Sequence, residues 1–111
     1  GNAIKATGAK CIIYTIPDRQ GGFSGGQTQG GFDSARATYN TSLRTDFATS
    51  TAYTNIFTGG SYADAMVDLY ADSIYQDATN TTYYQADKIH FASAGRSALA
   101  TYVTNAITLV S

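Results

Sequence analysis

The chain contains one histidine, His90, and an aspartate, Asp87, stands three residues before it. A histidine that acts as a general base needs a carboxylate that fixes its tautomer and stabilises the imidazolium formed during proton transfer. An alanine- and leucine-rich run at about 92–109 follows the pair and predicts a helix. Because a loop that enters a helix can hold both side chains on one side, the spacing predicts an acid–base pair.

Each residue of the pair also has a structural interpretation. An aspartate at the start of a helix complements the helix dipole, and a histidine in the same place is often an ordinary surface or capping residue. For Asp87 the two roles are compatible, since one carboxylate has two oxygens. For His90 the neighbouring sequence favours the catalytic interpretation.

That neighbouring sequence resembles the last conserved block of the SGNH (GDSL-type) serine hydrolases, in which Asp-x-x-His precedes a small or polar stretch, a glycine and a helix. Asp87, His90, Gly95 and the predicted helix match this block in order. Upstream segments resemble the family in the same order. They are a strand with a proline-containing turn at 10–17, a helix with Phe32–Arg36 and the Asn-x-x-Leu-Arg pattern Asn40–Arg44, and a strand at 65–70.

The resemblance implies an α/β fold, namely the C-terminal part of a three-layer α/β/α (flavodoxin-like) sandwich with a parallel sheet. The Gly-Asp-Ser block that carries the family's nucleophile and the Gly-x-Asn-Asp block of the oxyanion hole have no counterpart in the sequence. Residues 1–10 read as the end of a helix stopped by Gly8. We therefore expect 1–111 to be a fragment, the C-terminal half of one domain whose N-terminal half precedes it.

By resemblance, the complete domain is an esterase that hydrolyses an O-acyl ester of a carbohydrate or a small molecule without a cofactor. A serine outside this chain attacks the carbonyl, and His90, oriented by Asp87, transfers the proton. Arg19 and Arg96 are candidate contacts at the rim. The rival hypothesis is an inactive binding or structural module of an extracellular or phage-tail-like assembly, with loops that contact glycans. A third possibility is an engineered or proteolytic fragment.

The amino-acid composition narrows the range of partners and locations that we expect for the protein. The formal net charge is −1, which favours neither a nucleic acid nor an anionic membrane surface. No apolar run has the length of a membrane span. All eight acidic residues are aspartates, and threonine, tyrosine, serine, glycine and alanine are abundant, which favours an extracellular or virion-associated protein. The aspartates lack the spacing of metal ligands, so we expect no metal site.

Apolar patterning predicts the remaining elements. Residues 10–17 and 65–69 read as strands buried on both faces, and Cys11 as a small buried residue of the first. Residues 34–49 read as an amphipathic helix capped by Asp33 or Ser34, after a mobile glycine-rich loop at 20–31. Ser34 is a weak candidate nucleophile, because a floppy loop precedes it. We expect 51–62 to be irregular.

Overall fold

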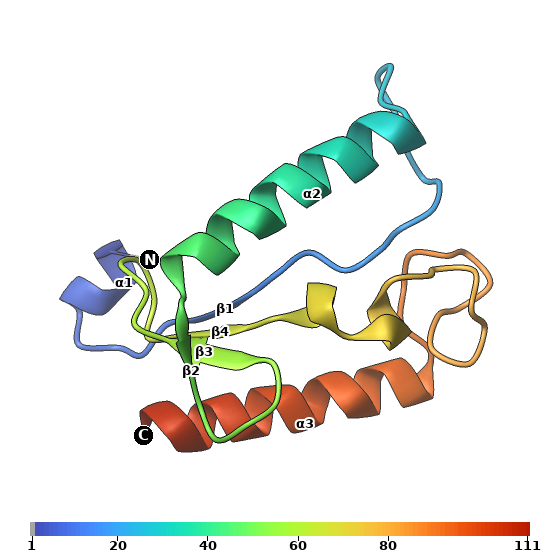
Figure 1. The fold of residues 1–111 in the computed structure, drawn as a ribbon. Helices are drawn as coiled ribbons and strands as arrows, with labels where there is room; N and C mark the ends of the chain where they lie inside the picture. The colour runs from blue at the N-terminus through green and yellow to red at the C-terminus, as the bar shows by residue number, and fades with distance from the viewer. Residues whose placement is uncertain (1) are drawn as a thin grey trace.

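The computed structural model describes residues 2–111, and it is a mixed α/β fold built on one four-stranded sheet. Two long helices and one short helix accompany the sheet, and two short 3-10 turns follow its last strand (Figure 1). The elements in chain order are α1 (Asn2–Ala6), β1 (Ile12–Tyr14), α2 (Gln29–Asp46), β2 (Thr49–Ser50), β3 (Ile56–Thr58), β4 (Ala65–Val67), η1 (Leu69–Ala71), η2 (Ser73–Tyr75) and α3 (Ser93–Val110).

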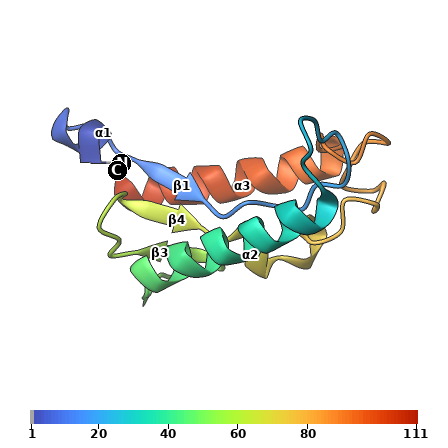
Figure 2. The ribbon, with the colours of Figure 1, turned by 90° about the horizontal axis from the view of Figure 1, so that it is seen from above.

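The strand order in the sheet is β1-β4-β3-β2, and only its first pair is parallel. Figure 2 shows β1, β4 and β3 side by side in this order. Ile13 of β1 lies opposite Met66 of β4 in the parallel pair. β3 runs antiparallel to both β4 and β2. The prediction of a parallel sheet is therefore correct for β1 and β4 alone. The segment 51–62, predicted to be irregular, supplies β3, whose three residues are too few to give a clear periodic signal.

The two predicted strands differ in burial. β4 is central and all three of its residues are buried. β1 lies at the edge of the sheet, where Ile12 and Ile13 are half-buried and the Tyr14 side chain is 50% exposed. The expectation of a first strand buried on both faces is wrong for β1, because an edge strand has a neighbour on one side only. Both strands are also shorter than predicted.

The long helices lie on opposite faces of the sheet (Figure 1). On one face, Leu99, Tyr102 and Ala106 of α3 pack with the buried residues of β3 and β4, as their spacing predicts. On the other face, Leu43 at the end of α2 packs with a second cluster. That cluster consists of buried Cys11, Phe47, Ala63 and Met66. Ile107, predicted to share the apolar stripe of α3, is 51% exposed instead.

The second helix begins five residues before the predicted start. Thr28 caps α2, its hydroxyl accepting a 3.1 Å hydrogen bond from the Gly31 amide. Asp33 and Ser34, predicted as caps, lie inside the first two turns. Glycines at 30 and 31 concealed this start, because glycine has poor helix propensity. Neither residue has a positive φ, so both adopt helical geometry.

Polar contacts fix α2 to the ends of two strands. The Arg36 guanidinium donates to Asp18 at 3.0 Å, beyond the end of β1, and Arg44 donates to Asp68 at 2.7 Å, directly after β4. Both aspartates are buried. Between the arginines lies Tyr70, whose ring is 5.2 Å from the Arg36 guanidinium and 4.7 Å from that of Arg44. The helix is thus positioned mainly by charge-assisted hydrogen bonds.

Asn40 makes a further polar contact from α2. Its side chain is fully buried, and its amide pairs with both backbone groups of Ile16, accepting from N–H at 2.7 Å and donating to the carbonyl at 3.0 Å. An asparagine amide can satisfy a donor and an acceptor at once, as a neighbouring strand would. Asn40 therefore occupies the outer edge of the extended segment that follows β1.

We expect Asn40→Ala to lower the free energy of unfolding by roughly 2–4 kcal/mol, because it removes a fully buried side chain and leaves both backbone groups of the half-buried Ile16 without their partner. Urea denaturation monitored by circular dichroism measures this change. Ser42→Ala, at an exposed position of the same helix, is the control and should shift stability by less than about 0.5 kcal/mol. Equal effects of the two substitutions would contradict the assigned role of Asn40.

Candidate active site

The predicted acid–base pair lies at one end of the molecule, where the parallel strands β1 and β4 point their carboxyl ends. The segments that follow these strands and the loop 76–92 before α3 gather at that end (Figure 1). Hydrogen bonds join them, since the Asp18 amide donates to the Tyr75 carbonyl at 2.7 Å and that of Gln20 to the Lys88 carbonyl at 3.0 Å. Ligands of α/β sheets commonly bind beyond such strand ends.

A small hairpin carries Asp87 and His90. Tyr84 and Phe91 pair as an isolated antiparallel bridge. Inside this bridge, the Gln85 amide donates to the His90 carbonyl at 2.8 Å, and the Lys88 amide donates to the Gln85 carbonyl at 2.9 Å. Lys88 adopts a φ of 60°, which the tight turn requires. The hairpin therefore holds residues 85–90 in one closed loop rather than in an extended chain.

The two oxygens of the Asp87 carboxylate have separate roles. Oδ1 accepts hydrogen bonds from the backbone amides of Ile89 and His90, both at 3.0 Å, and so closes the turn. Oδ2 lies 2.5 Å from Nδ1 of His90. A short contact of this kind assigns the proton on Nδ1 to the bond with the carboxylate and leaves Nε2 as the acceptor of the neutral ring. Asp87 therefore shapes the loop and orients the imidazole together.

The imidazole is accessible. Its side chain is 71% exposed, against 43% for that of Asp87. Within residues 2–111, Nε2 makes no hydrogen bond, so this nitrogen of an exposed ring is free while Nδ1 is held by the carboxylate. A general base requires this arrangement, with one nitrogen held by a carboxylate and the other open to a substrate or nucleophile.

Hydrogen bonding also sets the charge of Asp87. The bond from the His90 side chain, followed by those from the His90 and Ile89 amides, lowers the pKa of Asp87 to about 2. The carboxylate is consequently ionised throughout the neutral range. Because its pKa in the folded protein lies below the ordinary value of roughly 3.9, the stabilisation from this contact is complete above that value. It is lost as the pH falls towards 2.

Buried aromatic residues anchor the hairpin to the body of the protein. The Tyr84 hydroxyl donates to the backbone carbonyls of Asp18 at 3.1 Å and Tyr75 at 3.2 Å. Phe91 meets Tyr75 and Tyr84 edge-on, with ring centroids 5.1 and 5.2 Å apart. Burial raises the pKa of Tyr75 to about 12 and that of Tyr84 further, so both phenols remain neutral donors. These rings fix both ends of the loop that bears the pair.

Gly95 permits the close approach of the hairpin to α3. A side chain there would collide with the backbone carbonyl oxygen of Tyr83 and would lie 3.2 Å from Cβ of Phe91. The Gly95 carbonyl in turn accepts a 2.8 Å hydrogen bond from the Tyr75 hydroxyl. The glycine of the predicted motif therefore serves packing, since it lets the first turn of α3 lie against the strand that leads to Asp87.

Gly95→Ala should destabilise the protein by roughly 1–3 kcal/mol, because the added methyl group meets rigid backbone and overpacks the site. Thermal unfolding gives the size of the effect. The matched control is Gly30→Ala in α2, where the new Cβ meets no atom within 4 Å. That substitution should be neutral or stabilising by up to about 1 kcal/mol. A stable Gly95→Ala variant with an unchanged hairpin would refute the packing argument.

An acid titration followed by carboxyl carbon NMR tests the pairing of Asp87 with His90. We expect a pKa of about 2 for Asp87 in the unaltered protein. In His90→Ala it should rise towards roughly 3.9, while the remaining amide hydrogen bonds keep it below that value. Asp77 is the internal control, since its pKa is lowered by the side chain and amide of Thr79 and should not respond. An Asp87 pKa that does not change on this substitution would mean that the Asp87–His90 hydrogen bond does not form.

The other residues singled out in the sequence fall into two groups. Arg19 and Arg96 both lie at the end of the molecule that carries the pair; Arg19 bonds to the Gly21 and Gly22 carbonyls, and Arg96 to that of Phe91 at 2.6 Å. Ser34 lies in α2, and its carbonyl accepts from the Thr38 hydroxyl at 3.1 Å. No hydrogen bond in residues 2–111 connects the Ser34 hydroxyl with His90, so the two are not a catalytic couple in this structure.

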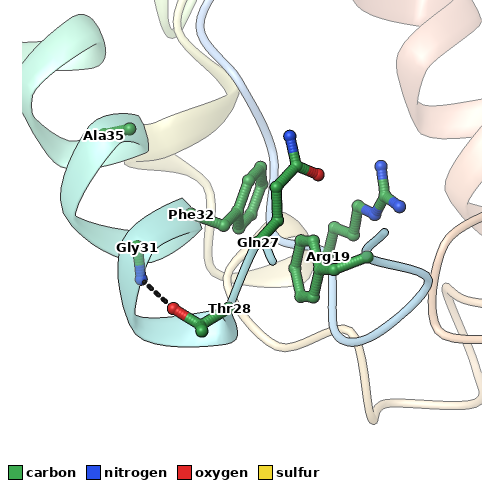
Figure 3. Close-up of a pocket in the computed structure, with 7 residues that line it drawn as sticks. Arg19, Gln27, Thr28, Gly31, Phe32 and Ala35 are labelled. Atoms are coloured by element: carbon green, nitrogen blue, oxygen red, sulfur yellow. Dashed lines mark hydrogen bonds between the residues drawn. The ribbon is translucent and has the colours of Figure 1, made fainter. Parts of the chain in front are cut away.

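A cavity of about 370 Å³ opens beside the hairpin, between the segment that follows β1 and the first turn of α2. Figure 3 shows the side chains of Arg19, Gln27 and Phe32 gathered around it. Phe23, an aromatic residue of the loop before α2, also lines it. Among the tyrosines outside the α-helices and β-strands, Tyr75 and Tyr84 are fully buried, whereas Tyr62 is 56% exposed.

The part of the chain at 2–111 contains no group of three or more histidine, cysteine, aspartate or glutamate side chains placed to hold a metal ion. Nor does any helix within those residues have the length and apolar character needed to cross a membrane. A comparison of the chain with protein-family models, curated proteins and solved structures finds no match.

The residues that hold the Asp87–His90 hairpin in place were not predicted from the sequence. Tyr75 and Tyr84 read as ordinary loop tyrosines, and no local pattern marks them as buried anchors. For Asp18 and Asp68 a signal exists, since each stands just after an apolar strand, where a carboxylate near a strand end needs a partner. Arg36 and Arg44, eight residues apart on one helix, are the partners that this signal would have suggested.

Proposed function

We propose that the chain is the C-terminal portion of an SGNH-type serine esterase, which hydrolyses an O-acyl ester of a carbohydrate or a small molecule. The observation that carries the proposal is the Asp87–His90 contact of 2.5 Å on an exposed hairpin, with Nε2 open to the outside. A surface histidine of purely structural function has no need of a carboxylate on Nδ1. The resemblance of residues 87–95 to the terminal block of that family adds support.

In the proposed reaction, Nε2 of His90 takes the proton of a serine hydroxyl while the serine oxygen attacks the ester carbonyl. Asp87 stabilises the imidazolium that results, and its low pKa keeps it ionised at that moment. The imidazolium then donates the proton to the departing alcohol oxygen. Water repeats the sequence on the acyl-enzyme, with His90 again as the base, and regenerates the serine.

The proposal extends to the rest of the fold. The outer edge of β1 has no neighbouring strand within residues 2–111. In a parallel pair of strands, every second residue forms its backbone hydrogen bonds with the same neighbouring strand. The backbone groups of Cys11 and Thr15 bond to β4. Those of Ile12 and Tyr14 therefore point to the opposite side, away from β4. An open edge next to a half-exposed tyrosine is consistent with a three-layer sandwich whose remaining parallel strands, and the serine, come from another segment.

A fluorophosphonate probe tests the esterase directly, because it labels a serine only when a base activates it. The intact protein that carries residues 1–111 should be labelled, with the label mapping to a serine outside this segment. His90→Ala should abolish labelling. Asp87→Asn should lower ester turnover by roughly three orders of magnitude or more, since the imidazole loses its tautomer and its counter-charge.

The matched control is Asp77→Asn. Asp77 is an exposed aspartate that also closes its own turn, by accepting from the Thr79 amide at 2.9 Å, but it has no histidine partner. Its substitution should leave labelling and turnover unchanged. An intact protein that is not labelled would refute the esterase and would favour a binding module of an extracellular assembly.

A further inference from the structure

The cavity beside the hairpin has an incompletely paired arginine in its wall. The half-buried Arg19 donates from Nε to the Gly21 carbonyl at 3.0 Å and from Nη2 to that of Gly22. Within residues 2–111, it has no carboxylate partner and its Nη1 makes no hydrogen bond. The other two half-buried arginines, Arg36 and Arg44, each pair with a buried aspartate. Arg19 therefore retains an unneutralised charge and free donors next to an open space.

Aromatic rings form the apolar part of the same wall. The Arg19 guanidinium lies 5.0 Å from the centre of the Phe23 ring, and this ring lies 5.6 Å from that of Phe32 at an interplanar angle of 42°. Gln27 and Thr28 supply polar groups at the margin. A ligand that fits such a wall has a flat face for the rings and an anionic group for the guanidinium.

The cavity wall is held firmly and is tied to the catalytic hairpin. The Gln29 side chain donates to the Arg19 carbonyl at 2.8 Å and accepts from the Gly21 amide at 3.1 Å. Gly22 lies directly against Ile89, the residue before His90, and leaves no room there for a side chain. The segment that carries Arg19 and the hairpin that carries His90 are therefore in direct contact, and both lie at the same end of the molecule.

We propose that this cavity binds a carboxylate attached to a six-membered ring, and that it receives this part of the ester substrate, the carboxylate being separate from the ester group that is cleaved. Aromatic acids and sugar acids are two chemical classes that carry such a group. The carboxylate pairs with the free Nη1 face of Arg19, and the ring lies against Phe23 and Phe32. The role in substrate binding rests on the esterase function proposed above, whereas binding of the free carboxylate does not.

Calorimetric titration of the intact protein that carries residues 1–111 tests this site with benzoate and with galacturonate as probes. At least one of the two should bind, and its uncharged counterpart, benzamide or galactose, should bind at least about tenfold more weakly. Whichever probe binds more tightly identifies the class of acid. Binding of neither probe, or equal binding of the charged and uncharged forms, would overturn the proposal.

Two variants locate the site. Arg19→Gln should weaken binding of the preferred probe by at least about tenfold, and Phe32→Leu should weaken it while the charge is retained. Lys10→Gln is the charge-matched control and should bind as the unaltered protein does, because the exposed Lys10 lies before β1 and outside the cavity wall. Equal losses for Arg19→Gln and Lys10→Gln would overturn the assignment. Binding that depends on Arg19 in a protein that resists the fluorophosphonate probe would refute the esterase and keep the site.

Discussion

The hydrogen bonds of the buried Asp18 carboxylate hold together the end of the molecule that carries His90, and the other contacts there depend on them. This carboxylate accepts from Arg36 of α2 at 3.0 Å and from the Ala78 amide at 2.8 Å. The backbone of the same residue binds Tyr75 and the Tyr84 hydroxyl. One residue thus joins the strand end, the second helix and the loop that leads to the hairpin. Breaking one partner of such a buried pair leaves a charge without compensation, which is strongly destabilising.

The position of His90 follows from this arrangement. The ring itself is exposed, and within the described residues 2–111 only Asp87 holds it, but Asp87 is held by a turn whose base is the Tyr84–Phe91 bridge. Tyr84 in turn reaches Asp18. Every contact between His90 and Asp18 in this series is a hydrogen bond or an aromatic contact of defined geometry. The exposed imidazole is therefore oriented by residues in the interior of the protein. Catalytic groups depend on supporting residues of this kind for their precision.

The sequence predicted the parts of the structure that have a local signature. The last helix and the Asp87–His90 pair follow from short-range spacing, and β4 from an apolar run. Features that depend on contacts between distant parts of the chain could not be predicted in this way. The mixed sheet depends on the pairing of β3 with β4, and nothing within residues 56–58 specifies that pairing. The start of α2 was hidden by two glycines, which the Thr28 cap and the packing of the loop override.

The cavity beside Arg19 could not be predicted either, since its wall joins Arg19 and Phe23 with Phe32 only after α2 has docked. Docking of this helix depends more on amide and guanidinium groups than on apolar area, with Gln29, Arg36, Asn40 and Arg44 each bonded to a strand end or a loop. The spacing of apolar residues is the main sequence guide to helix packing, and it predicts little about a helix that is held mostly by polar contacts.

The open edge of β1 has a consequence for the behaviour of the chain in solution. Unpaired backbone groups on an exposed strand are a template for any other strand, including the same strand of a second copy. Lys10 and Pro17 flank this segment, and residues of these two types commonly restrain aggregation beside an apolar strand. Whether the polypeptide stays dispersed in solution should therefore depend more on the groups that cover the outer edge of β1 than on its overall charge.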